Sequence, residues 1–160
     1  MVGLVLIYPV GQIDNNRVPH LTMQQTGQAP QLGIVEPVPG KYYSLILDDP
    51  DAPGVLSGYL HWIVMDLNPY NDSEPGQEVL SYTGPNPPDR PHQYRATLYQ
   101  HDHQIRISLF DDIKRVGYPM SQLLPLLSLS PKYQVDQIGF IVGPSEPNYT
   151  ANSSINIVGQ

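Results

Sequence analysis

Prolines are spread along the whole chain, and their distribution constrains the fold more than any other feature. The 160 residues include 18 Pro and 13 Gly. Because proline lacks a backbone N–H and clashes with the preceding helical turn, it interrupts helices and central strands. Little room is left for long helices, so we expect strands and ordered loops to dominate. The length suits one domain, which we expect to span residues 1–160.

Apolar runs of strand length alternate with turn residues along the chain. The runs 42–47 and 60–67 are nearly continuous, which is typical of core strands covered on both faces. An all-β dominated fold with one or two short helices follows. The expected strands are 4–8, 32–35, 42–47, 60–67, 79–83, 94–99, 105–110 and 137–142, with edge strands at 21–29 and 155–158. The expected helical segments are 111–116 and 121–127, the second interrupted by Pro125.

Charge and composition exclude several function classes. The net charge is −7, and the eight Lys and Arg residues are scattered, so we expect no nucleic-acid binding and at most peripheral membrane contact. There is no cysteine, which excludes disulfides and thiol chemistry. Residues 1–10 are apolar but lack a basic start, and no apolar window reaches the length of a membrane span. We therefore expect a cytoplasmic protein.

An acidic segment, Asp48-Asp49-Pro50-Asp51-Ala52-Pro53, directly follows the first core strand. If Pro50 keeps the segment extended, the carboxylates of Asp49 and Asp51 lean the same way. His61 lies in the next core strand, and His92 precedes another strand. Two acids and two histidines at strand ends indicate the wall of a pocket, although Asp-Pro sequences also form simple turns.

Several chemistries are compatible with these residue types. Two His and two carboxylates can bind zinc or iron, but the spacing matches no standard metal signature, and His101 with His103 is only a second candidate. No Gly-x-Ser-x-Gly nucleophile elbow, P-loop or Gly-x-Gly-x-x-Gly motif is present. We expect no cofactor, no metal and no catalytic residue. A hydrolase with Asp49 or Asp51 as base and a histidine as acid stays open as an alternative.

Four motifs in this order resemble the phosphatidylethanolamine-binding protein family, which includes the Raf kinase inhibitor protein and plant flowering regulators. The family has a β-sandwich-like fold, and the resemblance is strongest over residues 4–110 and absent after 143, which leaves 143–160 as a poorly matched tail. The motifs are Asp49-Pro50-Asp51-Ala52-Pro53, Leu60-His61-Trp62-Ile63-Val64, Tyr82-Thr83-Gly84-Pro85-Asn86-Pro87-Pro88 and His92-Gln93-Tyr94-Arg95.

The resemblance implies a small anion-binding pocket and a non-enzymatic role. Its ligand would be phosphate or a phospholipid head group such as phosphoethanolamine, and a protein partner such as a kinase would use the same surface. Trp62 would support His61 from behind. The residues implied as ligand-binding are Asp49, Asp51, His61, Gly84, Pro88, His92 and Tyr94.

Two carboxylates repel a phosphate, so binding requires shared protons. A protonated His61 or His92, or one neutral Asp, would supply them, which predicts stronger binding at acid pH. The chain also departs from the family pattern. Pro85-Asn86 stands where the family usually has a small residue and Gly, and Gln93 stands where it usually has Arg. An interaction scaffold with a vestigial pocket is therefore a second alternative.

Overall fold

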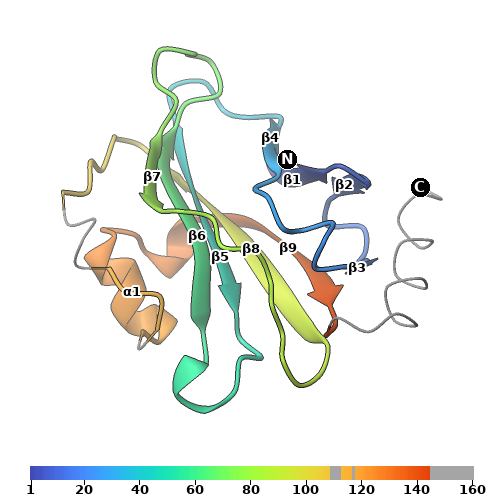
Figure 1. Ribbon diagram of the computed structural model, residues 1–160. Coiled ribbons are helices and arrows are strands. Elements are labelled where there is room, and N and C mark those ends of the chain that lie inside the picture. The colour runs from blue at the N-terminus through green and yellow to red at the C-terminus, as the bar shows by residue number, and fades with distance from the viewer. Residues whose placement is uncertain (109–112, 117, 145–160) are drawn as a thin grey trace.

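Two β-sheets form the molecule in the computed structural model, which describes residues 1–108, 113–116 and 118–144 (Figure 1). The smaller sheet is antiparallel, with order β2-β1-β4. It contains β1 (Gly3–Tyr8), β2 (Gly11–Ile13) and β4 (Gln31–Val35).

The larger sheet has six strands in the order β3-β9-β8-β5-β6-β7. All neighbouring pairs are antiparallel except β3 with β9. Its strands are β3 (His20–Leu21), β5 (Tyr42–Asp49), β6 (Tyr59–Leu67), β7 (Gln77–Leu80), β8 (His92–His101) and β9 (Gln134–Val142). Within the described residues, the helices are α1 (Met120–Leu126) and two single 3₁₀ turns, Gly54–Leu56 and Pro131–Tyr133.

The large sheet is covered on both faces, which explains its apolar strands. In Figure 1 the small sheet lies on one side of it and α1 on the other. Alternate residues of β5 enter different cores: Leu45 and Leu47 face the small sheet, and Ile46 packs with leucines of α1. Burial of both faces favours continuous apolar runs over an apolar–polar alternation.

The predicted strands at 4–8, 32–35, 42–47, 60–67, 94–99 and 137–142 are confirmed, as is the helix at 121–127. The strand expected at 79–83 lies slightly earlier, as β7. One short strand, β2, was missed because Gly11 and Gln12 were interpreted as a turn.

Three expected elements are not formed over the residues that the structure describes. The segment 21–29 is not an edge strand beyond Leu21, since it folds into turns in which the Thr26 N–H donates to Thr22 O and the Thr22 N–H donates to Gln25 Oε1. The return strand expected at 105–110 is absent over 105–108, and 113–116 is not helical. The other residues of these segments, and the edge strand expected at 155–158, lie outside the described residues.

In the part of the chain that the structure describes, no helix is both long and apolar enough to span a bilayer.

Candidate functional site

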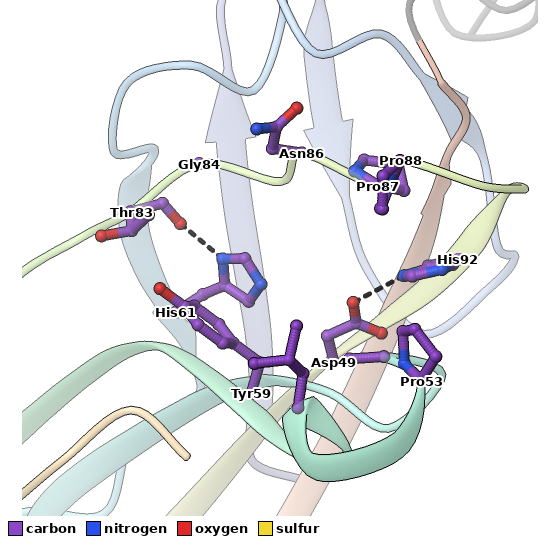
Figure 2. Close-up of a pocket in the computed structure, with 12 residues that line it drawn as sticks. Asp49, Pro53, Tyr59, His61, Thr83, Gly84, Asn86, Pro87, Pro88 and His92 are labelled. Atoms are coloured by element: carbon purple, nitrogen blue, oxygen red, sulfur yellow. Dashed lines mark hydrogen bonds and ion pairs between the residues drawn. The ribbon is translucent and has the colours of Figure 1, made fainter.

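A cavity of about 270 Å³ opens at the end of the large sheet where β5 ends and β6 begins. Three strands contribute polar side chains to it: Asp49 from β5, His61 from β6 and His92 from β8 (Figure 2). The loop after β7 covers it. The lining is completed by Ala52, Pro53, Leu56, Tyr59, Thr83, Gly84, Asn86, Pro87 and Pro88.

Asp49 reaches this cavity because side chains alternate along β5. Leu45 and Leu47 face the core between the sheets, so Asp49, two positions on, points the same way where that core ends. The strand then stops at Pro50, and the Asp49 carbonyl accepts from the N–H groups of Ala52 and Gly58. The carboxylate of Asp49 is thereby fixed at the floor of the cavity.

His61 is the extra residue of a β-bulge. In the pairing of β5 with β6, Leu47 lies opposite Trp62 and Asp48 opposite Leu60, which leaves His61 without a partner on β5. A bulge of this kind bends the strand and re-aims a side chain. The freed His61 carbonyl accepts from Thr83 N at 2.9 Å and from Arg115 Nη1 at 3.4 Å. His61 therefore turns its ring toward the cavity.

The His61 ring is held in one orientation. Its Nδ1 lies 2.6 Å from Thr83 O, and a carbonyl can only accept, so Nδ1 carries the hydrogen. Figure 2 shows the second ring nitrogen, Nε2, directed into the cavity. Burial lowers the pKa of His61, and its hydrogen bond to Thr83 offsets this in part. At neutral pH, Nε2 thus presents a lone pair to a ligand.

His92 has both ring nitrogens engaged and is 1% exposed. Nδ1 lies 2.7 Å from Asp49 Oδ2, and Nε2 lies 2.8 Å from Asp89 Oδ1. When both carboxyl groups are ionised, these two hydrogen bonds need hydrogen on both ring nitrogens, which is the imidazolium form. Asp89 is thus part of the site, although it does not line the cavity.

The loop over the cavity depends on a glycine. A Cβ on Gly84 would lie 2.9 Å from Thr26 O and 3.2 Å from Gly27 Cα, which is closer than backbone atoms tolerate. Tyr82 secures the same contact, because its hydroxyl donates to Thr26 O at 2.6 Å. The loop is therefore packed directly on the turns at 22–27, and Asn86 adds a polar side chain to the lining.

The family model described as "Phosphatidylethanolamine-binding protein" matches residues 10–140. The chain belongs to this family. The fold agrees: a carboxypeptidase Y inhibitor, solved with its cognate proteinase, has a TM-score of 0.72 at 20% identity and covers 89% of this chain and 84% of its own. The phosphatidylethanolamine-binding protein from Plasmodium vivax has a TM-score of 0.68 at 19% identity and covers 91% and 86%.

Sequence relatives include plant and bacterial members of the phosphatidylethanolamine-binding protein family. CEN-like protein 1 of Nicotiana tabacum is 44% identical over 62 residues, which is 36% of each chain. A UPF0098 protein of Chlamydia pneumoniae is 35% identical over 98 residues, 51% of this chain and 65% of its own. The chain thus matches less than two thirds of the length of each of these relatives.

Two residues that the family resemblance implied for the pocket do not line it. Asp51 was expected to converge with Asp49, but its Oδ2 accepts from Gln93 N at 2.8 Å and its N–H donates to Asp49 Oδ1 at 2.9 Å. The chain turns at Pro50 instead of staying extended. The carboxylates of Asp49 and Asp51 therefore accept from different donors and do not converge on one ligand.

Tyr94 is buried beneath the pocket. Its ring meets the His61 ring edge-on at 5.2 Å between centroids and stacks on Phe140 at 5.6 Å. Burial, and after it the carboxylates of Asp49 and Asp51, raise the pKa of Tyr94. Tyr94 therefore supports His61 from below. The support expected from Trp62 is not seen, since Trp62 packs edge-on against Tyr82 and donates to Glu78.

Asp48, the first residue of the acidic segment, does not face solvent. It is 1% exposed and forms two hydrogen bonds with Arg95, from Nε at 3.0 Å and from Nη2 at 2.6 Å. The pair lies beside a second cavity, which Tyr118 and Met120 also line. Arg95 thus pairs with an acid, but with Asp48 and not with a pocket carboxylate.

The second histidine candidate is structural. His101 is buried, its Nδ1 donates to His103 O, and its Nε2 lies 2.8 Å from Ser44 Oγ. Both nitrogens are therefore used within the protein. Over residues 1–108, 113–116 and 118–144, no group of three or more His, Asp and Glu side chains is arranged to hold a metal ion.

Sequence reasoning missed three contributors to the site: Asp89, Thr83 and Tyr59. Asp89 and His92 are three positions apart with Pro91 between them, a spacing that could have indicated a contact. Thr83 acts through its carbonyl, and Tyr59 packs its ring 4.8 Å from that of His61. The residue types of Thr83 and Tyr59 do not by themselves indicate these two roles.

Proposed function

We propose that this chain is a non-enzymatic binding protein that holds a phosphorylated small molecule or a phospholipid head group in the pocket of Asp49, His61 and His92. The observation that carries the proposal is the convergence of these three side chains, from three strands, on one cavity. A ligand that enters here meets polar groups at the floor and apolar groups at the rim. A phospholipid has the matching arrangement, because its polar head group is attached to apolar acyl chains.

The size of the cavity favours a head group over a whole lipid. Its volume of about 270 Å³ lies at the lower end of ligand pockets. The rim is formed by Pro53, Leu56, Pro87 and Pro88, of which Leu56 is 44% exposed. An acyl chain would therefore lie across this rim, outside the pocket. The same rim suits contact with a protein partner, and a cytoplasmic location stays part of the proposal.

Phosphate oxygens need hydrogen-bond donors, and His61 supplies one only when it is protonated. Because burial lowers the pKa of His61, this protonation requires acid pH or the presence of the anion itself. An ammonium group has donors of its own and can bond to Asp49 or to the lone pair of His61 Nε2. Phosphoethanolamine carries both groups, and its phosphate is expected to bind more tightly as pH falls.

Binding is favoured over hydrolysis by the state of His92. Both of its ring nitrogens are already bonded to carboxylates, so it has no free N–H to give to a leaving group as the acid of a hydrolase, and Asp49, the expected base, is held by His92 and the Asp51 N–H. The residues that line the described cavity include no serine that could act as nucleophile. Both observations support a site that holds its ligand without chemical change.

Isothermal titration calorimetry with phosphoethanolamine at pH 6.0 and 7.5 tests the proposal. The wild type is expected to bind at both values and more tightly at pH 6.0, while His61→Ala weakens binding at least about tenfold because the free ring nitrogen is lost. His103→Ala is the matched control, since His103 is exposed and distant from the lining. Absence of binding by the wild type at both pH values would contradict the proposal.

A further inference from the structure

The charges around His92 leave the pocket with an excess of negative charge. Asp49 and Asp89 each carry one negative charge, and the His92 cation between them carries one positive charge. His61 is neutral at neutral pH because burial lowers its pKa. The group formed by these four side chains therefore has a net charge of −1.

The neighbouring charged groups do not reverse this balance. Asp51 is bonded to Gln93 N, and Arg90 is exposed, with Nε 4.0 Å from Asp89 Oδ2 and Nη2 3.4 Å from Asp51 O. Arg115 lies behind His61, where it donates to the carbonyls of Leu60 and His61. Asp51 and Arg90 offset each other in formal charge, and the positive charge of Arg115 lies outside the cavity lining, on the His61 side. The negative charge therefore stays at the His92 end of the pocket.

His61 Nε2 is the ring nitrogen that remains for a ligand. Within the described residues it has no protein hydrogen bond, and it is directed into the cavity (Figure 2). His92 has no ring nitrogen left for a ligand, because Nδ1 is bonded to Asp49 at 2.7 Å and Nε2 to Asp89 at 2.8 Å. A fully ionised phosphate monoester therefore meets no Lys or Arg side chain among the described lining residues, while Asp89 adds a second negative charge beside His92.

We propose that Asp89 is a specificity-determining residue, which makes the pocket select ligands that bring a hydrogen-bond donor to His61 Nε2 over fully ionised phosphate. Ammonium groups and a singly protonated phosphate monoester have such a donor, whereas the dianion of a phosphate monoester has none. This inference rests on the proposed function. It names the ligand charge that the same pocket accepts.

The substitution Asp89→Asn separates charge from geometry. The amide oxygen of asparagine still accepts from His92 Nε2, so the ring keeps its position, while one negative charge is removed. Because Asp89 is 43% exposed, solvent screens its charge, and we expect its loss to change affinity by about two- to fivefold. Affinity for methyl phosphate at pH 7.5 is expected to rise, and affinity for ethanolamine to fall.

Opposite changes for the two probes are the distinguishing result, because a merely structural defect would weaken both. Calorimetry at pH 7.5 with methyl phosphate, whose dianion has no O–H, and with ethanolamine compares the wild type, Asp89→Asn and Asp102→Asn. Asp102 pairs with Lys41 away from the cavity, so its variant is expected to match the wild type. Thermal unfolding of each variant confirms that it is folded.

The outcomes separate the two proposals. If the proteins bind phosphoethanolamine but Asp89→Asn leaves both probe affinities unchanged, or shifts them in the same direction, the inference is wrong and the proposed function stands. If no variant binds any of the three compounds, the proposed function fails and the inference fails with it. Nitrogen NMR of the His92 ring gives a second readout: a ring nitrogen without hydrogen in the wild type at pH 7.5 would also overturn the inference.

Discussion

Asp48 and Asp49 are neighbours in β5, and their carboxylates lie on opposite faces of the large sheet. Asp48 pairs with Arg95 beside the second cavity, and Asp49 pairs with His92 in the candidate ligand pocket. The alternation of side chains along a strand separates them. A single acidic segment therefore supplies one ion pair to the fold and one to the site.

The pair of Asp48 and Arg95 is expected to respond unequally to loss of either partner. Arg95→Met strands a carboxylate that is 1% exposed, which costs about 3 kcal/mol of unfolding free energy. Asp48→Leu strands a guanidinium whose side chain is 34% exposed, so the loss is about 1–2 kcal/mol. The double variant is expected within about 1 kcal/mol of the wild type, because apolar groups replace both charges. Urea unfolding measures all three.

The pH dependence of the unfolding free energy of Arg95→Met tests whether the stranded Asp48 carboxylate causes the loss of stability. Burial already raises the pKa of Asp48 in the wild type, in spite of the bonds from Arg95 that lower it. Without Arg95 the folded state takes up a proton more readily than the unfolded chain, so the stability of the variant rises as pH falls toward 4. Equal losses for the two single variants, or a stability that falls toward pH 4 more steeply than in the wild type, would contradict this account.

Tyr8 of the small sheet and Tyr82 of the pocket loop are hydrogen-bonded to each other, and we expect their substitutions to cost unequal amounts of unfolding free energy. The Tyr82 hydroxyl donates to Thr26 O, and the buried Tyr8 hydroxyl lies 2.9 Å from the Tyr82 hydroxyl. Burial raises the pKa of Tyr82 to about 12, so this hydroxyl keeps its hydrogen in the physiological range. Tyr8→Phe removes one hydrogen bond and costs about 1 kcal/mol, while Tyr82→Phe leaves two buried groups unpaired and costs about 2–3 kcal/mol. A larger loss of unfolding free energy in urea for Tyr8→Phe than for Tyr82→Phe would contradict the hydrogen bonds that connect Tyr8, Tyr82 and Thr26.

The close approach at Gly84 predicts that a single methyl group destabilises the loop. Gly84→Ala places Cβ 2.9 Å from Thr26 O and is expected to cost about 1–3 kcal/mol. Gly27→Ala is the matched control on the other side of the contact, where the nearest atom is at 3.4 Å. Its unfolding free energy is expected to change by less than about 1 kcal/mol. Equal effects in denaturant unfolding would show that the contact is not tight.

His61 gives the protein a pH-dependent loss of stability. Burial lowers the pKa of His61 from its usual 6.5, so the unfolded chain binds a proton more readily than the folded one. Stability is therefore expected to fall as pH drops from about 7.5 to 5.5. In His61→Asn, which can still donate to Thr83 O, the fall is expected to be smaller. Melting temperatures in phosphate-free buffers measure the difference, and parallel curves for the two proteins would contradict the prediction.

The sequence predicted the strands of the fold because their burial requires apolar runs that are visible in residue type. The expected core strands 42–47 and 60–67 became β5 and β6. The segment 21–29 could not be predicted in the same way, since side-chain bonds from Thr22 and Gln25 to the backbone decide its turns. Polar segments have several such choices, and residue type does not rank them.

The site was predictable in part, for a similar reason. Asp49, His61 and His92 stand out as polar groups at the ends of apolar strands, and the cavity brings them together. The bulge that aims His61 depends on the register between β5 and β6, which single residues do not encode. Asp51 was misplaced because Pro50 was expected to keep the chain extended, whereas it begins a turn.

The central claim is that His61 Nε2 meets the ligand, and nitrogen NMR of the five histidine rings tests it most directly. On addition of phosphoethanolamine at pH 6.0, the Nε2 signal of His61 is expected to shift most, with a smaller change at His92. His101 and His103, which lie away from the cavity lining, are expected to stay unchanged. A titration that leaves His61 unchanged, or that shifts His101 and His103 instead, would contradict the account.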